Sequence, residues 1–385
     1  MNQLPPIAET PETRALLNER TVVAVGVSGG KDSVACLIAV DRYLNAIGFK
    51  GPRLAVHSHL GSVEWAQSHF KCEEAAKSLG WELVVVERAA GGMMERWHSR
   101  WNNNVRRYTE LSCVQLILPW STPSMRFCTS ELKTAVIRSY LKRTYPDHNI
   151  LNATGIRREE SANRSKMPIA KHEPQSARKG YAAYQWNPII EWQESDVWRA
   201  IASQGLEPHE AYTRYKMGRV SCRWCIMSSS ADAYNATLDP AGHNLYREMV
   251  ELEVRSTFSF QSNKWLADVN PDLLTPATLE RVAHAKAVAQ QRKLLEAAIP
   301  KHLRYANGWP TAAPSLAEAR LLSEIRLEVS TGVGFAARFT DPHSIIERYE
   351  ELLRMKDVKG MNPGSETTQL IPLTNVLSPQ QLSFF

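Results

Sequence analysis

The fold class follows from the segment Thr21-Val-Val-Ala-Val-Gly-Val27, which is followed at once by Ser28-Gly-Gly-Lys-Asp-Ser33. The first part is almost entirely apolar and rich in β-branched residues, which is typical of a strand buried on both faces of a sheet. Beyond the glycines, apolar residues from Val34 to Ile47 recur at helical spacing, and Gly48 provides a stop signal. The sequence therefore predicts a buried strand, a tight turn and a helix.

Short strands alternate with helices over the next part of the chain. The expected elements are, in order, a strand at Leu54–His57, a helix around Val63–Leu79 ending at Gly80, a strand at Glu82–Glu87, a helix near Ser130–Lys142, a strand at Ile150–Thr154 and the apolar run Trp186–Ile190. Strands joined by helices through such short links form a parallel sheet covered on both faces. The predicted fold class is α/β, a doubly wound parallel sheet.

The C-terminal part of the chain has a different pattern, of helices alone. We expect helices from Thr275-Pro276 to Ala298, over Ser315–Val329 and over Ile345–Met355. A length of 385 residues is compatible with two or three domains. The predicted division is an N-terminal extension (1–20), a sheet-containing domain (21–235), a helical domain (236–356) and a polar, flexible tail (357–385).

Composition narrows the class of protein. Charged residues make up 22% and apolar residues 43% of the chain, which excludes disordered, collagen-like and coiled-coil classes. No apolar run is long enough to span a membrane, and the first residues have no apolar signal core, so we expect a cytoplasmic protein without a membrane partner. A net charge of +6 is compatible with a phosphate-rich partner. Six cysteines in such a chain argue against a disulfide framework and leave metal or catalytic roles open.

The turn Ser28–Ser33 has the chemistry of an anion site. Its glycines let the backbone turn sharply and direct N–H groups at an anion, and the dipole of the following helix adds positive potential. Lys31 can neutralise phosphate charge, and Ser28 and Ser33 can donate hydrogen bonds. The spacing differs from that of the Gly-x-x-x-x-Gly-Lys-Ser/Thr nucleotide loop. The alternative is an ordinary glycine turn with an exposed lysine.

In this context the segment SGGKDS resembles the signature of the N-type ATP pyrophosphatases, the PP-loop superfamily, which also contains the phosphoadenosine phosphosulfate reductases. Its fold is the adenine nucleotide alpha hydrolase-like one. Further segments resemble the reductase branch, in the expected order: Arg126-Phe127-Cys128-Thr129 with Leu132-Lys133, Gly155-Ile156-Arg157-Arg158-Glu159-Glu160-Ser161 with Arg164, Asn187–Trp192 with Ser195–Trp198, and Tyr212 to Cys225. The resemblance covers about residues 20–235.

The resemblance implies ATP and Mg²⁺ as cofactors. In this superfamily the loop holds the pyrophosphate of ATP while a substrate oxygen attacks the α-phosphorus, which gives an adenylated intermediate. The implied nucleotide-binding residues are Ser28, Gly29, Gly30, Lys31, Asp32, Ser33, Gly155, Arg157 and Arg164, and the implied catalytic residues are Lys31, Asp32 and Arg157. Arg158 is a further candidate for a substrate or α-phosphate contact, although these arginines can also belong to a solvated charged loop.

Three cysteines are candidate ligands of a [4Fe–4S] cluster. Cys222 and Cys225 form a Cys-x-x-Cys pair, whose spacing lets two thiolates reach one metal or cluster. Cys128 lies where the family places its first cluster cysteine, but Phe127 occupies the position of an adjacent family ligand. Zinc, a redox dithiol and ordinary buried cysteines remain alternatives. Cys113 is a possible fourth ligand without a motif.

The other two cysteines have a simpler interpretation. Cys36 and Cys72 lie in predicted helices, and we expect both to be small core residues.

Two features favour sulfur transfer over sulfate reduction. The reductases usually replace the Lys-Asp part of the loop, whereas Lys31 and Asp32 are present here, and no cysteine follows Cys225 as a nucleophile. The combination resembles the iron–sulfur thiolation enzymes of tRNA and the sulfurtransferase of DNA phosphorothioation systems. It implies an ATP-dependent sulfurtransferase that adenylates an acceptor and takes sulfur from a donor such as a cysteine desulfurase. The alternatives are a phosphoadenosine phosphosulfate or adenylylsulfate reductase and a non-catalytic nucleotide-binding regulator.

Nucleic acid is a candidate acceptor. Bases and aromatics interleave over residues 96–108, as in surfaces that combine backbone contacts with stacking, although Trp97 and Trp101 are spaced i, i+4 and can equally be core residues. His57 and His59 end a strand where a superfamily site lies, or are ordinary strand-end histidines.

The last five residues suggest a second partner. Gln381-Leu382-Ser383-Phe384-Phe385 resembles the motif by which bacterial DNA-handling proteins bind the replicative sliding clamp, with folding back on the chain or disorder as alternatives.

Overall fold

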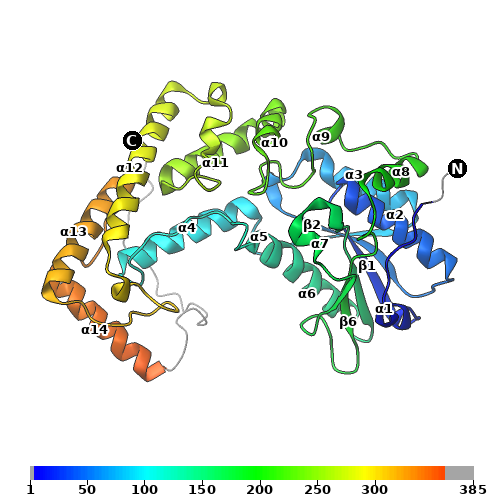
Figure 1. Ribbon diagram of the computed structural model, residues 1–385, viewed down its shortest axis with the longest axis horizontal. Coiled ribbons are helices and arrows are strands. Elements are labelled where there is room, and N and C mark those ends of the chain that lie inside the picture. The colour runs from blue at the N-terminus through cyan, green and yellow to red at the C-terminus, as the bar shows by residue number, and fades with distance from the viewer. Residues whose placement is uncertain (1–3, 360–385) are drawn as a thin grey trace. The chain divides into compact units, whose positions relative to one another are not determined.

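The computed structural model describes residues 4–359, and these form two compact units (Figure 1). The first unit comprises residues up to Asn102 together with Leu118–Ala289. The second comprises Asn103–Ile117 together with the residues from Gln290 onward. Two long helices, α4 (Met93–Thr109) and α12 (Pro276–Ala298), each contribute residues to both units.

The first unit is built on a six-stranded sheet of order β3-β2-β1-β4-β6-β5. All neighbouring strands are parallel except β5 and β6. The strands are β1 Thr21–Val27, β2 Arg53–His59, β3 Glu82–Glu87, β4 Asn149–Ala153, β5 Ala170–His172 and β6 Ala183–Trp186. The predicted α/β class and the doubly wound parallel sheet are confirmed.

Helices make up most of the remainder. In the first unit they are α1 Pro11–Leu16, α2 Lys31–Ala46, α3 Ala66–Ser78, α5 Phe127–Thr129, α6 Ala135–Thr144, α7 Ala162–Ser165, α8 Glu194–Ser203, α9 Glu210–Thr213, α10 Ser230–Asn235 and α11 His243–Ser256. The second unit adds α13 Leu316–Val333 and α14 Pro342–Lys359. The helices predicted in this C-terminal part are confirmed, and Ser315 caps α13 by accepting the N–H of Glu318.

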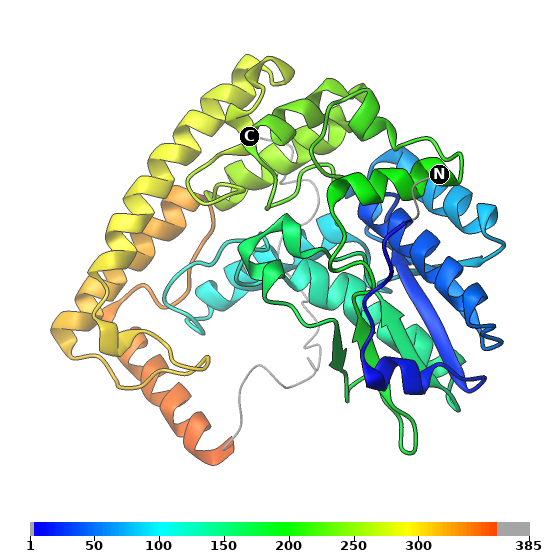
Figure 2. The same ribbon diagram turned by 45° about the vertical axis from the view of Figure 1, so that its right-hand side comes forward.

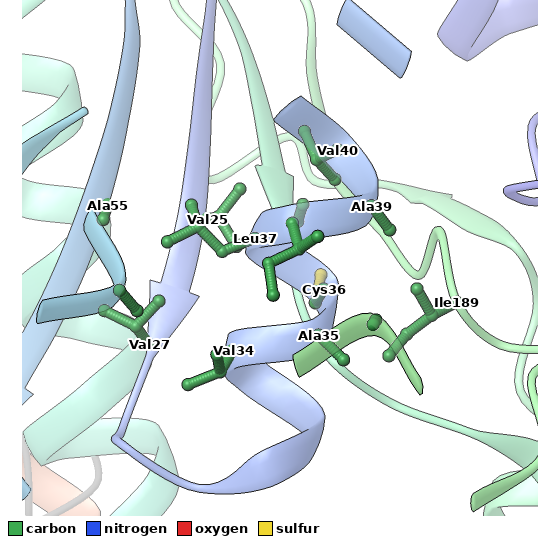
Figure 3. Close-up of a cluster of buried hydrophobic side chains, with 14 of the residues drawn as sticks. Val25, Val27, Val34, Ala35, Cys36, Leu37, Ala39, Val40, Ala55 and Ile189 are labelled. Atoms are coloured by element: carbon green, nitrogen blue, oxygen red, sulfur yellow. The ribbon is translucent and has the colours of Figure 1, made fainter. Parts of the chain in front are cut away.

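Strand β1 is buried on both faces because successive side chains point to opposite sides of the sheet. Val25 and Val27 join a large core cluster with Leu37 of α2, as Figure 3 shows. On the other face, Val22 and Ala24 join a smaller cluster that contains Leu141 of α6. Helices therefore cover both faces of the sheet (Figure 2).

The N-terminal residues are tied to the same unit. The backbone N–H of Ala8 donates to the carbonyl of Pro188 at 2.7 Å. The indole N–H groups of Trp186 and Trp192 donate to the carbonyls of Ala8 (2.8 Å) and Pro6 (3.1 Å). Since both tryptophans are buried, their indole nitrogens require such partners.

The first unit extends past residue 235, where the sequence pattern suggested a boundary. The Trp224 ring packs on Tyr246 of α11 with 5.5 Å between centroids. The side chain of Gln261 donates to the carbonyls of Cys225 (3.3 Å) and Ser228 (3.0 Å). Residues after 235 thus support the segment that carries Cys222 and Cys225.

The sheet reverses its strand order between β1 and β4. The chain leaves β1 toward β2 on one side, while β4 lies on the other side of β1. In open α/β sheets, ligands bind at the carboxyl ends of the strands at such a point. The loop after β4 approaches the loop after β1 so closely that a Cβ atom on Gly155 would lie 2.3 Å from the carbonyl oxygen of Asp32.

This close approach predicts that Gly155→Ala destabilises the protein. The added methyl group meets backbone, which cannot rotate away, so we expect the free energy of unfolding to fall by about 1–3 kcal/mol. Gly26→Ala is the matched control, because its Cβ would lie 3.7 Å from the nearest atom, the carbonyl oxygen of Ala153. Thermal unfolding of both variants measures the difference; equal midpoints would contradict the predicted clash.

Candidate active site

The loop Ser28–Ser33 joins β1 to α2 and is ordered by its own side chains. The hydroxyl of Ser33 donates to the carbonyl of Gly30 at 2.8 Å and accepts the N–H of Ser28 at 3.1 Å. Gly29 has a φ of +73° and its α-carbon faces the carbonyl of Ser68, where a Cβ would lie only 2.8 Å away. Only glycine fits this position, because other residues disfavour this conformation and lack the space.

A large cavity opens above this loop. It encloses about 1400 Å³ of space between atoms, part of it open to solvent. Part of its lining comes from the ends of β1, β2 and β4 and the loops that follow them: Gly26, Val27, Ser28, Gly30, Asp32 and Ser33; Val56, Ser58 and Glu64; Asn152, Thr154, Gly155, Ile156, Glu160 and Arg164. The rest comes from other parts of the first unit: Arg126, Thr129, Lys133, Thr134 and Ile137; Glu173 and Gln185; Arg219, Val220 and Ser221. The cavity lies at the reversal of strand order between β1 and β4.

Four cations line the cavity. Arg164 forms an ion pair with Glu160. The other three are Arg126, Lys133 and Arg219, and within residues 4–359 their side chains make no ion pair. Cations without carboxylate partners at a helix N-terminus are a fitting environment for a polyphosphate.

Lys31 is not among the residues that line this cavity. Its ammonium group is buried, with 6% of the side chain exposed, and lies 3.4 Å from Asp32 Oδ2 and 3.5 Å from Glu194 Oε1. It also lies over the ring of Tyr212, 5.5 Å from the centroid. The hydroxyl of Tyr212 accepts the backbone N–H of Lys31 at 3.1 Å. The charge of Lys31 is thus matched within the protein.

Asp32 lines the cavity and is held by Arg157. The Nε of Arg157 donates to Asp32 Oδ1 at 2.7 Å, and its Nη1 pairs with Glu159. Burial lowers the pKa of Arg157, but the hydrogen bond and charge of Asp32 outweigh burial and leave the pKa raised. Arg158, by contrast, pairs with Glu191 outside the cavity. Of the three predicted arginines, Arg164 alone lines the cavity.

The cysteines come from two segments of the first unit, one with Cys128 and one with Cys222 and Cys225, and all three are partly exposed. The pKa of Cys222 is raised to about 12, mainly by burial; Lys133 opposes this shift, and the charges of Cys225, Glu64 and Cys128 add to it. The charges of Cys128, Cys225 and Lys133 all act on the Cys222 thiol, and Lys133 also lines the cavity. No three carboxylate, imidazole or thiol groups among residues 4–359 are placed to hold a single metal ion.

The other cysteines lie elsewhere. Cys36 and Cys72 are fully buried in the main core cluster, as predicted. Cys113 belongs to the second unit, where its sulfur accepts a hydrogen bond from Asn104 at 3.9 Å. Burial raises the pKa of Cys113 to about 11.

His57 is a structural residue beneath the loop. Its Nδ1 donates to the carbonyl of Val27 at 3.1 Å and its Nε2 donates to Glu64 at 3.1 Å. A carbonyl oxygen can only accept, so Nδ1 carries a proton, and a proton on Nε2 as well makes the imidazole a cation that pairs with Glu64. Burial lowers the pKa of His57, but Cys72 and Glu64 more than offset this and raise it to about 10. His59 is 42% exposed and lies within 4 Å of Glu64 and Glu87.

The prediction of a stacking surface over residues 96–108 is wrong, and the alternative of core residues holds for its aromatic rings. Trp97 is 3% exposed and packs edge-on against Trp120 and Phe260, and Trp101 is also 3% exposed. Tyr108 is fully buried. These rings fall on the buried side of α4, so their faces are occupied by other side chains and cannot stack on bases.

Three cavity residues escaped the sequence-based assignment. Arg126 and Lys133 lie inside a segment that matched the family, and Arg219 lies three residues before Cys222. Their position within matched segments was the available signal. Nothing local distinguished them from the paired cations, because pairing depends on the fold. Gln381–Phe385 lie outside the described residues.

Residues 22–227 match the phosphoadenosine phosphosulfate reductase domain. This match covers more than half of the chain, which therefore belongs to that family and to the PP-loop superfamily expected from its sequence. The chain is thereby placed among the enzymes related to phosphoadenosine phosphosulfate reductase.

Individual relatives are more distant. An uncharacterized 37.8 kDa protein of Escherichia phage 186 is 22% identical over 244 residues, which are 56% of this chain and 70% of that protein. The adenosine 5'-phosphosulfate reductase of Neisseria meningitidis serogroup B is 36% identical over 72 residues, which are 19% of this chain and 27% of the reductase.

Among solved structures, the U34-tRNA thiolase NcsA of Methanococcus maripaludis with its [4Fe-4S] cluster aligns with a TM-score of 0.32 and 15% identity. The alignment covers 62% of this chain and 73% of that one. A likeness this weak does not distinguish one activity from another.

No helix among residues 4–359 is long and apolar enough to cross a membrane.

The cationic state of His57 predicts a pH-dependent stability. Since its pKa rises from 6.5 to about 10 on folding, the contribution of His57 is fully present below pH 6.5 and is lost as the pH rises through 10. The difference in free energy of unfolding between wild type and His57→Gln should shrink over this range. Chemical denaturation from pH 6 to 10.5 measures it, with the exposed His59→Gln as control. A difference that stays constant with pH would count against a cationic His57.

Proposed function

We propose that this protein is an ATP-dependent sulfurtransferase that adenylates an acceptor and then replaces AMP with sulfur. The observation that carries the proposal is the cavity above the loop Ser28–Ser33. Its lining includes three cations that have no carboxylate partner among residues 4–359 and that lie in the same segments as the cysteines Cys128, Cys222 and Cys225. Membership of the phosphoadenosine phosphosulfate reductase family supports sulfur chemistry in this cavity.

The cavity suits the triphosphate of ATP. Ser28, Gly30 and Ser33 line it, next to the N-terminus of α2. The charges of Arg126, Lys133 and Arg219 can offset those of the phosphates, together with Mg²⁺. Asp32 is the carboxylate of the loop Ser28–Ser33 and lines the cavity, so it is the candidate ligand for that ion.

The chemistry follows from this arrangement. An acceptor oxygen attacks the α-phosphorus while the bond to the β-phosphate oxygen breaks, and pyrophosphate leaves. Cations placed at the β- and γ-phosphates stabilise the charge that develops on the departing group. Sulfide then displaces AMP from the acceptor, because AMP is a far better leaving group than the original oxygen.

The three cysteines are of the right kind to hold an iron–sulfur cluster. Thiolates are the ligands of such clusters, and each binds a different iron, so they stand further apart than the ligands of one zinc ion. Zinc is the alternative metal for the same thiolates. When bound through Cys128, Cys222 and Cys225, a [4Fe–4S] cluster would supply one iron free to accept incoming sulfide.

Two alternatives lead to different products. A phosphoadenosine phosphosulfate or adenylylsulfate reductase would release sulfite and needs no ATP cleavage. Against it stand the retained Lys31-Asp32 and the lack of cysteine in residues 226–385. A non-catalytic regulator would bind nucleotide without turnover.

A polar depression adjoins the cavity and offers a place for the acceptor. It is lined by Arg126, Thr129, Ser130, Thr134, Arg138, Glu173 and Gln175, four of which also line the cavity. Every lining residue can form hydrogen bonds, and none is apolar. Such a surface fits a phosphodiester backbone better than an apolar substrate, which favours a nucleic-acid acceptor.

The cluster assignment predicts the metal content of the protein. Anaerobically isolated protein should be brown and contain iron and acid-labile sulfide, and Cys222→Ala should remove most of both. Cys36→Ala should leave them unchanged, because that thiol is buried in the core. Iron, sulfide and zinc analysis checks this. Colourless protein with stoichiometric zinc would overturn the assignment.

The adenylation step predicts the products of ATP cleavage. With single-stranded DNA or tRNA as acceptor and sulfide present, the reaction should release pyrophosphate and convert α-labelled ATP to labelled AMP. Arg219→Ala should lower kcat/KM by about tenfold or more through loss of a phosphate contact. Lys31→Ala is expected to lower turnover as well.

Arg138→Ala tests the acceptor depression within the same assay. It should raise KM for the nucleic acid by about tenfold and leave KM for ATP unchanged, since Arg138 lines the depression but not the cavity.

Formation of ADP and orthophosphate would exclude the proposed mechanism. Reduction of adenylylsulfate to sulfite without ATP would establish the reductase alternative.

A further inference from the structure

A closed ring of polar contacts surrounds the base of the loop. Lys31 Nζ lies 3.4 Å from Asp32 Oδ2, Asp32 Oδ1 accepts from Arg157 Nε at 2.7 Å, and Arg157 Nη1 pairs with Glu159. Glu159 Oε2 accepts the backbone N–H of Glu194 at 2.8 Å. The carboxylate of Glu194 then returns to Lys31 Nζ at 3.5 Å. The ring joins the loop, the segment after β4 and the start of α8.

Both cations of this ring are buried. Lys31 is 6% and Arg157 is 3% exposed, so each depends on its carboxylate partners to offset the loss of hydration. Glu194 is about half exposed and lies at the first position of α8. With two positive and three negative side chains, the ring has a net charge of −1.

We infer that Lys31 is a positioning residue, which holds the loop in place through its ion pair with Glu194 and does not contact the phosphates. This structural role of Lys31 is called the strut below. The inference rests on the proposed nucleotide site. Lys31 is absent from the lining of the large cavity and lies on the side of Tyr212 and Glu194. The phosphates are met by Arg126, Lys133 and Arg219, whose side chains are not engaged by carboxylates in the described part of the chain.

Charge balance distinguishes a strut from a phosphate contact. Removing Lys31 alone leaves three carboxylates balanced by one cation beneath the loop, which repels a polyphosphate. Neutralising Glu194 as well restores the original net charge of the ring. If Lys31 instead contacted the phosphates, Glu194→Gln would improve ATP binding in the Lys31 variant only as much as it does in any other background, and the Arg219 variant measures that general effect.

The test is a double-mutant cycle with ATP as the probe in titration calorimetry. Lys31→Met should weaken ATP binding about tenfold, and adding Glu194→Gln should bring the Kd back to within about threefold of wild type. Arg219→Met is the matched control: it should weaken binding about tenfold with or without Glu194→Gln. A double variant of Lys31 and Glu194 that binds ATP as weakly as Lys31→Met would overturn the inference.

Thermal unfolding of the same variants tests the strut without nucleotide. Lys31→Met and Glu194→Gln should each lower the midpoint, and the double variant should lower it by less than the two single shifts combined, because the partners act on each other. Additive shifts would refute the strut. Wild-type protein that fails to bind ATP would refute the proposed function alone, while this second cycle still decides the role of Lys31.

Discussion

The contact between the loop after β1 and the loop after β4 is the constraint on which the site depends. Because Gly155 has no side chain, its backbone can lie close to the carbonyl of Asp32, and the two loops approach until Arg157 reaches the Asp32 carboxylate. His57 fixes the other side by donating to the carbonyl of Val27. The end of β1 is therefore held from both neighbouring strands, and the cavity opens where they diverge.

Burial of charge organises the surroundings of this contact. The cations of Lys31 and Arg157 are paired with carboxylates inside the protein, whereas Arg126 and Arg219 line the cavity and have no carboxylate partner in the described part of the chain. This division separates charges that stabilise the loop from charges available to a ligand. It follows from desolvation, since a cation removed from water needs a partner within the protein and one in an open cavity does not.

The segment with the cysteines depends on residues far along the chain. The buried carboxylate of Glu253 accepts the N–H groups of Phe260 (2.6 Å), Leu266 (2.7 Å) and Ala267 (3.0 Å), which shapes the loop that carries Gln261. Gln261 in turn holds the carbonyls around Cys225. The helical residues after 235 thus belong to the support of the candidate site.

Local pattern in the sequence was enough to determine the strands β1 to β4, the loop Ser28–Ser33 and the core positions of Cys36 and Cys72, because strand burial and glycine turns depend on neighbouring residues. Local pattern could not give the charges that face the cavity or the burial of the rings of α4, because ion pairing and burial are set by residues distant in the chain. Lys31 pairs with Glu194, and Trp97 packs against Phe260.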